Sequence, residues 1–213
     1  MLIASYNPKG TGDTLVVILG QDVDDQSTEV HDGVARIFDD KTGNTLGYNF
    51  LKASSLINRL KSENGQVFLT SHEVATLNDY LAANGFPADL SVDDTPKFVI
   101  GYVEKMEDHP NSDHLKVTTT KVDDGNKLQI VSGSPNMQAD IKVVVAKIGA
   151  MMPDGLIIWP GALRGVESDG MIVSGRELHL KNAPQKKGAL ILPDDFGEVG
   201  EPFDFEKGQH IFD

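Results

Sequence analysis

The stretch LKVTTTKVDDGNKLQIVSG, residues 115–133, decides the fold of the C-terminal half of this chain. Its first part is rich in β-branched residues, which favour strands. Asp124-Gly125-Asn126 follows as a strong turn signal, and the apolar run KLQIVSG begins directly after it. A β-branched run, an Asp-Gly turn and a second apolar run together predict a β-hairpin.

Further strand-like segments surround this hairpin. FVIGYVEKM precedes it, and KVVVAKIGA and GLIIWPGALRG follow it. Five short strands with glycine at several bends fit a small closed barrel, such as an OB-fold, better than a sandwich. Ser174 and Glu177 have the spacing of a capping box, which predicts a short helix over 174–180. We therefore expect an all-β OB-fold barrel with a short helix.

The N-terminal half has a mixed pattern. Short apolar runs separated by turns include VARIF and TLGYNF, which predict a second hairpin. The clearest helix is predicted over 71–84, where Thr70 caps the helix and Glu73 completes a capping box. ASSLINRL at 53–60 predicts another short helix. These elements indicate an α+β domain.

A change of composition separates the two halves. The segment FPADLSVDDTP contains two prolines and several acids and shows no periodicity, as is typical of a linker. The sequence thus predicts an acidic α+β domain of unknown role at 1–90, a linker at 91–96, an OB-fold domain at 97–193 and an acidic C-terminal tail at 194–213.

The acidic charge is concentrated outside the predicted barrel. The net charge is −13. Residues 1–96 hold 6 basic and 14 acidic residues, and residues 193–213 hold 1 and 7. Residues 97–192 hold 12 basic and 11 acidic residues. Because salt screens charges over about 8 Å at physiological ionic strength, a local basic patch on the barrel can still bind an anionic partner.

Several classes of protein are disfavoured by the sequence. It has no cysteine, so it forms no disulfide and no thiolate metal site. It has no apolar run of the roughly 20 residues that a membrane span needs, and its start lacks the pattern of a secretory signal. We expect a cytoplasmic protein that does not enter a membrane.

Catalytic and cofactor motifs are also missing. The sequence contains no G-x-S-x-G elbow, phosphate-binding loop or dinucleotide fingerprint. His109, Asp113 and His114 lie on a predicted turn that does not present three metal donors on one face. We therefore expect no enzyme activity, no cofactor and no metal.

Two short strings carry candidate binding residues. HPNSDHLK ends at Lys116, which points either to solvent or to a phosphate. RGVESDGM begins at Arg164, a residue suited to a bidentate phosphate contact. Ser168 could bond a base edge or a ribose hydroxyl, and Met171 could pack on a base. Both strings could instead have a purely structural role. The first would then be a simple turn, and the second would be an irregular crossover whose methionine fills the end of the barrel.

These strings, together with LQIVSGSPN, VVVAKIGAMMP and GALILP, make residues 97–192 similar to the EMAP-type tRNA-binding OB domain. That domain also occurs in the beta chain of bacterial phenylalanyl-tRNA synthetase. The whole chain resembles the standalone YtpR-type tRNA-binding proteins of Gram-positive bacteria. The resemblance implies a five-stranded barrel that binds tRNA mainly through backbone and shape. The implied RNA contacts are Asn111, Lys116, Arg164, Ser168, Met171 and Ser174.

Two other functions stay open beside a non-catalytic tRNA-binding protein. A dimeric peptide-binding chaperone resembles the same barrel, and fold alone does not fix function. Such a chaperone should expose an apolar patch, whereas an RNA binder should expose a basic one. An enzyme housed in residues 1–90 has the least support. A homodimer and an association with the translation machinery also stay open.

Overall fold

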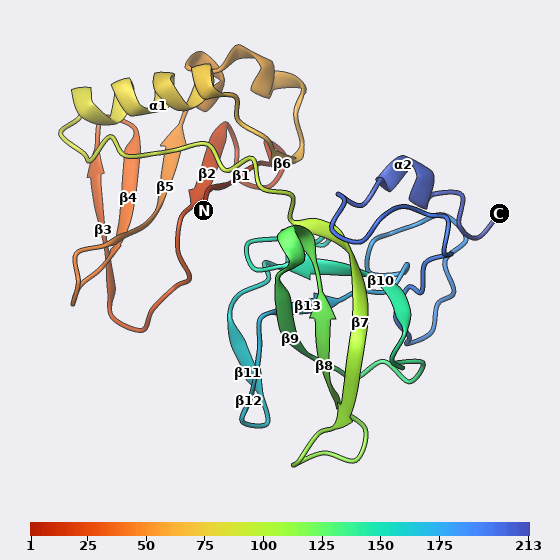
Figure 1. The fold of residues 1–213 in the computed structure, drawn as a ribbon. Coiled ribbons are helices and arrows are strands. Elements are labelled where there is room, and N and C mark those ends of the chain that lie inside the picture. Colours follow the sequence, from red (N-terminus) through yellow and green to blue (C-terminus); the bar gives the residue numbers. More distant parts are fainter. The chain divides into compact units, whose positions relative to one another are not determined.

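The structure is a computed structural model that describes residues 1–213, and it divides into two compact units (Figure 1). Unit 1 is Met1–Asp94 and unit 2 is Thr95–Asp213. The division falls inside the segment 91–96 that the sequence marks as a linker. Both units are built mainly of β-strands.

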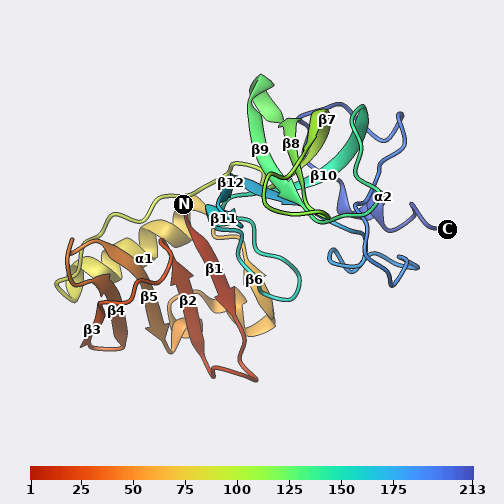
Figure 2. The same ribbon diagram turned by 90° about the horizontal axis from the view of Figure 1, so that it is seen from below.

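Unit 1 is a six-stranded antiparallel sheet with the strand order β3-β4-β5-β2-β1-β6. The helix α1 (Ser71–Ala83) covers one face of this sheet (Figure 2). The predicted hairpin is confirmed by the pairing of β4 with β5. The strands are β1 (Ile3–Tyr6), β2 (Thr14–Ile18), β3 (Gln26–His31), β4 (Val34–Asp39), β5 (Thr45–Leu51) and β6 (Gly65–Val67).

The start of α1 is the one predicted. Thr70 accepts a hydrogen bond from the amide of Glu73, and the Glu73 carboxylate accepts one from the amide of Thr70. Val74, Leu77 and Leu81 form the buried face of the helix against the sheet. A capping box followed by apolar residues at helical spacing therefore specified this element correctly.

Several elements of unit 1 differ from the prediction. Residues 53–60 form two short 3-10 turns, Ala53–Ser55 and Asn58–Ser62, in place of one helix. The strand β3 was not predicted, because all six of its residues are exposed and its sequence therefore shows no apolar alternation.

Unit 2 contains a five-stranded antiparallel sheet with the order β13-β10-β7-β8-β9. The predicted hairpin is present as β8 and β9, which pair from Lys116–Ser132 to Lys121–Lys127. A separate two-stranded hairpin, β11–β12, precedes β13. The strands are β7 (Phe98–Asp108), β8 (Lys116–Lys121), β9 (Lys127–Ser132), β10 (Ile141–Lys147), β11 (Gly161–Leu163), β12 (Val166–Ser168) and β13 (Gly170–Ile172).

The sheet of unit 2 curls so that its two edge strands almost meet. The Asp169 amide donates to the Gln129 carbonyl over 2.8 Å, and the Gln129 side chain donates to the Glu167 carbonyl over 2.8 Å. The Ser168 hydroxyl accepts from the Val131 amide on β9 over 3.0 Å. This nearly closed barrel confirms the predicted fold class, an α+β unit followed by an OB-type barrel.

The predicted helix at 174–180 is only a single turn. Its capping box forms, since Ser174 and Glu177 exchange hydrogen bonds. The turn stops because His179 has a positive φ of 54°, which no regular helix continues. The short helix of this unit is α2 (Phe205–Gly208), capped by Asp204.

Residues 194–213, expected as a tail, pack against the barrel in the structure. The Ile100 amide donates to the Glu201 carbonyl over 2.9 Å, and the Phe203 amide donates to the Phe98 carbonyl over 2.9 Å. The rings of Phe196 and Phe203 are buried and stack 5.4 Å apart. The acidic composition hid these phenylalanines, which attach the segment to unit 2.

Candidate nucleic-acid interface

The two strings singled out in the sequence lie against each other in the structure. The loop between β7 and β8 and the β11–β12 hairpin project from the same end of the barrel (Figure 1). The side chain of Asn111 donates to the Arg164 carbonyl over 3.2 Å, and the Arg164 guanidinium donates to the Asn111 carbonyl over 3.2 Å. His109 adds a third bond, from Nε2 to the Leu163 carbonyl over 2.9 Å. The strings therefore form one surface.

The His109 ring is held as a single tautomer. Its Nδ1 accepts a hydrogen bond from the Asn111 amide over 3.0 Å, so this nitrogen carries no proton. Nε2 then carries the proton and donates it to the Leu163 carbonyl. The ring is 4% exposed. Both ring nitrogens of this buried side chain are thus used to fix the loop and the hairpin, and neither is left to bind a metal.

Arg164 occupies the tip of the β11–β12 hairpin. Arg164 and Gly165 have φ values of 47° and 86°, as in the two-residue turns that match the twist of a hairpin. The Arg164 side chain is exposed and forms no ion pair, and its one bond goes to the neutral Asn111 carbonyl. Its remaining N–H groups can bind a phosphate.

Lys116 is placed differently from Arg164. It begins β8, and its ammonium pairs with the exposed Asp108 carboxylate on β7. This contact lowers the pKa of Asp108 below its ordinary value. A phosphate must therefore compete with Asp108 for Lys116.

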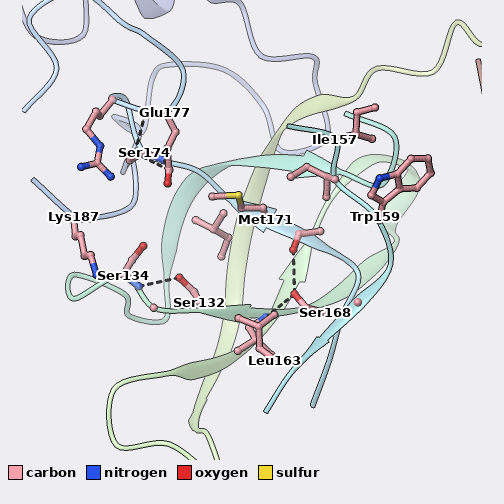
Figure 3. Close-up of a pocket in the computed structure, with 18 residues that line it drawn as sticks. Ser132, Ser134, Ile157, Trp159, Leu163, Ser168, Met171, Ser174, Glu177 and Lys187 are labelled. Carbon is pink, nitrogen blue, oxygen red and sulfur yellow. Dashed lines mark hydrogen bonds between the residues drawn. The ribbon is translucent and has the colours of Figure 1, made fainter. Parts of the chain in front are cut away.

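Ser168, Met171 and Ser174 line one pocket of about 420 Å³ beside this surface (Figure 3). Met171 is half-buried and packs partly against the core. Ile157 and Trp159 lie at one end of the pocket in Figure 3, and Lys187 lies at the other end. The pocket thus has an apolar end and a cationic end.

The two serines in this pocket are already hydrogen-bonded within the protein. Ser168 accepts from the Val131 amide and donates to the Gly170 carbonyl over 3.1 Å. The Ser174 hydroxyl donates to the Glu177 carboxylate over 2.7 Å and accepts from the Glu177 amide over 3.2 Å. Both serines are less than a tenth exposed. Their hydroxyls hold the walls of the pocket in place.

The structure thus gathers the predicted site residues into two neighbouring groups. Asn111 and Arg164 form the linked loops, and Ser168, Met171 and Ser174 line the pocket, while Lys116 is in an ion pair outside both groups. The linking role of His109 was not predicted, because its spacing suggested only a turn or a weak metal site. Trp159 and Lys187 were not predicted either, because no sequence motif includes them.

No group of three or more histidine, aspartate or glutamate side chains is placed to hold a metal ion. None of the helices is both long enough and apolar enough to cross a bilayer.

Comparison with known families divides the chain at the same place as the structure. Residues 98–202 match the family described as "Putative tRNA binding domain". Residues 21–93 match a "Domain of unknown function (DUF4479)". The first family thus covers the barrel and its linked loops, and the second covers most of the sheet of unit 1.

Similar proteins fall into two groups. "Phenylalanine--tRNA ligase beta subunit" of Acinetobacter baylyi is 40% identical over 123 residues, which are 56% of this chain and 15% of that protein. The same subunit of Oceanobacillus iheyensis is 46% identical over 111 residues, 50% of this chain and 14% of that protein. "Putative tRNA-binding protein YtpR" of Bacillus subtilis is 47% identical over 204 residues, 95% of this chain and 99% of that protein. This identity along nearly the full length of both proteins shows that the chain belongs to the YtpR family.

Proposed function

We propose that this protein is a non-catalytic tRNA-binding protein that contacts tRNA mainly through its backbone and shape. The observation that carries the proposal is the linked pair of loops, which presents the unpaired Arg164 guanidinium at the hairpin tip. In OB-folds the loops that join strands 1 and 2 and strands 4 and 5 bind oligonucleotides. The Asn111 loop and the Arg164 hairpin occupy these two positions, and the names of the relatives point the same way.

The chemistry of the site suits this role. Folded RNA is recognised largely through phosphates, ribose hydroxyls and shape, which requires cations and hydrogen-bond donors on a rigid frame. Arg164 and Lys116 supply cations and Asn111 supplies an amide. Met171 offers an apolar contact, and Ser168 and Ser174 support the pocket from within. The Ser112 hydroxyl lies 3.3 Å from His114 Nδ1, but the Asp113 carboxylate contacts the same ring nitrogen at 2.8 Å. A Ser-His-acid relay needs the serine and the acid on different ring nitrogens, so we propose no reaction for this surface.

Binding of tRNA also implies a cytoplasmic location and contact with the translation machinery. We include both in the proposal, together with a homodimer. Sedimentation of the purified protein, alone and with tRNA, separates a monomer from a dimer.

The central test is a mobility-shift titration of the full chain with total tRNA, with duplex DNA as control, at two salt concentrations. We expect tRNA to bind more tightly than DNA and to lose affinity at the higher salt concentration. Equal binding of both nucleic acids, or no binding of tRNA, would contradict the proposal.

The apolar end of the pocket favours a second candidate, the peptide-binding chaperone. Ile157 lies at this end, and Leu163 and Met171 also line the pocket. A chaperone should slow the aggregation of an unfolded client protein, and excess tRNA should not relieve this effect if the two ligands use different surfaces. If the protein does not slow aggregation, the chaperone function is contradicted and tRNA binding remains as the single proposal.

A further inference from the structure

We propose that the pocket beside the linked loops continues into a groove that binds unpaired RNA nucleotides. A base would lie at the end formed by Trp159 and Met171, and the adjoining phosphates would lie along Arg176, Lys187 and Lys186. This inference rests on the proposed function and extends it, because it assigns the single-stranded part of the RNA to a site separate from the Arg164 tip.

The groove is made of two adjoining cavities. The first, of about 420 Å³, contains Trp159, Met171 and Arg176. The second, of about 430 Å³, contains Lys186. Ser174, Lys187 and Gly188 line both cavities. The cavities therefore meet at Lys187, and each has the volume of a small-ligand site.

The cations along this groove have no carboxylate partner within the protein. Several lysines of unit 2 face a carboxylate, as in the pairs Lys116–Asp108, Lys127–Glu104 and Lys147–Asp123. None of the three groove cations forms an ion pair, as is also the case for Arg164. These cations are Arg176, Lys186 and Lys187.

One acidic side chain, Glu177, also lines the first cavity. Its carboxylate accepts hydrogen bonds from the amide and the hydroxyl of Ser174 over 2.8 and 2.7 Å. Three unpaired cations beside one hydrogen-bonded carboxylate favour an anionic chain over a neutral peptide.

The apolar end of the groove suits a nucleobase. Trp159 is half-exposed beside Ile157, and Met171 lies between these residues and Lys187 in Figure 3. Bases of any kind stack on aromatic side chains, with about 1–3 kcal/mol per base lost on alanine substitution. A concave pocket admits a splayed base but not a base pair, so unpaired nucleotides fit better than a helix.

Trp159 provides a direct readout because it is the only tryptophan of the chain. We expect a short single-stranded oligoadenylate, and intact tRNA, to quench its fluorescence. The same titration with tRNA that lacks its unpaired 3′ nucleotides identifies the source of the bound segment. Loss of quenching assigns the groove to the 3′ end, and retained quenching assigns it to a tRNA loop.

Variants test the same groove by mobility shift with the oligoadenylate. Trp159→Ala should weaken binding about fivefold or more, whereas Trp159→Phe should keep most of it, because phenylalanine still stacks. Arg176→Ala and Lys187→Ala should each weaken binding about two- to fivefold, as expected for solvent-accessible ionic contacts. Lys121→Ala is the matched control, because this exposed lysine lies at the opposite end of β8 from the loops.

The outcomes separate this inference from the proposed function. If tRNA binds while Trp159 fluorescence stays unchanged and the groove variants bind as the wild type does, the groove assignment is wrong and the Arg164 surface stands. Failure of tRNA to bind at all contradicts the proposed function. Quenching by an apolar peptide but not by the oligoadenylate would overturn the assignment in favour of the chaperone.

Discussion

The Nε2 atom of His109 lies 2.9 Å from the Leu163 carbonyl oxygen, although the two residues are 54 positions apart in the chain. This bond fixes the position of the loop that carries Asn111 relative to the hairpin that carries Arg164. Because the ring also accepts the Asn111 amide, one buried side chain sets the geometry of both motifs.

Replacing His109 should therefore affect stability and tRNA binding together. In His109→Ala, the Asn111 amide and the Leu163 carbonyl lose their partner, at a cost of about 1–3 kcal/mol in unfolding free energy. The loops should also become more mobile, so tRNA affinity should fall even at temperatures where the barrel is fully folded. Hydrogen exchange of the loop amides and a tRNA titration measure the two effects.

The control for this variant is His114→Ala in the same loop. The His114 side chain is 62% exposed and contacts only exposed groups, so its loss should leave stability nearly unchanged. An effect of His114→Ala as large as that of His109→Ala would show that the link to Leu163 is not what matters.

Ser168→Ala should lower the stability of the barrel itself. The hydroxyl accepts the Val131 amide of β9, so its removal leaves a buried donor unpaired between the two edges of the sheet. We expect a loss of about 1–3 kcal/mol in the unfolding free energy of unit 2. Thermal melts followed by Trp159 fluorescence report this unit alone, because unit 1 has no tryptophan. A melt unchanged from the wild type, combined with weakened tRNA binding, would instead indicate a direct RNA contact.

The case of Ser168 shows where sequence reasoning succeeds and where it stops. The β8–β9 hairpin was predictable because β-branched residues and an Asp-Gly turn act locally. The role of Ser168 depends on which strand it meets after the chain has closed into a barrel, and no local pattern reveals that partner. The same applies to His109, whose spacing suggested only a turn or a weak metal site.

The packing of the C-terminal segment against the barrel was not predicted for a related reason. Charge averaged over 194–213 describes exposed side chains, whereas Phe196 and Phe203 decide where the segment packs. The helix α1 was predictable because its capping box and its apolar face lie within one short stretch.

The Arg164 tip should contribute a measurable ionic contact with tRNA. We expect Arg164→Ala to weaken binding by roughly 1.5–3 kcal/mol, the value of a charge-assisted hydrogen bond. In the wild type, the logarithm of the binding constant should fall linearly with the logarithm of the salt concentration. We expect a shallow slope, which corresponds to about 2–4 phosphate contacts. The variant should lose about one unit of this slope. A wild-type slope in the variant would place Arg164 away from phosphate.

Removal of unit 1 should not weaken tRNA binding. Residues 1–94 carry 6 basic and 14 acidic residues and so repel RNA weakly. A fragment of residues 95–213 keeps all the linked loops, the groove and the packed C-terminal segment, and we expect it to unfold cooperatively. Its tRNA affinity should equal or exceed that of the full chain. A large loss of affinity in a folded fragment would show that unit 1 contributes contacts of its own.

Unit 1 should lose stability in acid through Glu73. The Arg59 guanidinium donates to both Glu73 carboxylate oxygens, over 2.5 and 2.9 Å, and lowers the pKa of Glu73 to about 2 from its ordinary 4.5. The folded state thus binds a proton at Glu73 less readily than the unfolded state does. The stabilisation is therefore complete above about pH 4.5 and is lost as the pH falls toward 2.

Glu73→Gln tests this dependence directly. At neutral pH the variant should be less stable by an amount on the order of 3 kcal/mol, which is the pKa shift expressed as free energy. Because the wild-type carboxylate becomes protonated in acid, the difference between wild type and variant should shrink as the pH approaches 2. Hydrogen exchange of the α1 amides measures this stability within unit 1. The control is Glu63→Gln, since Glu63 binds the same Arg59 with a side chain that is 34% exposed and should matter less. A difference that stays constant from neutral pH to pH 2 would show that the Arg59–Glu73 pair does not stabilise α1 through its charge.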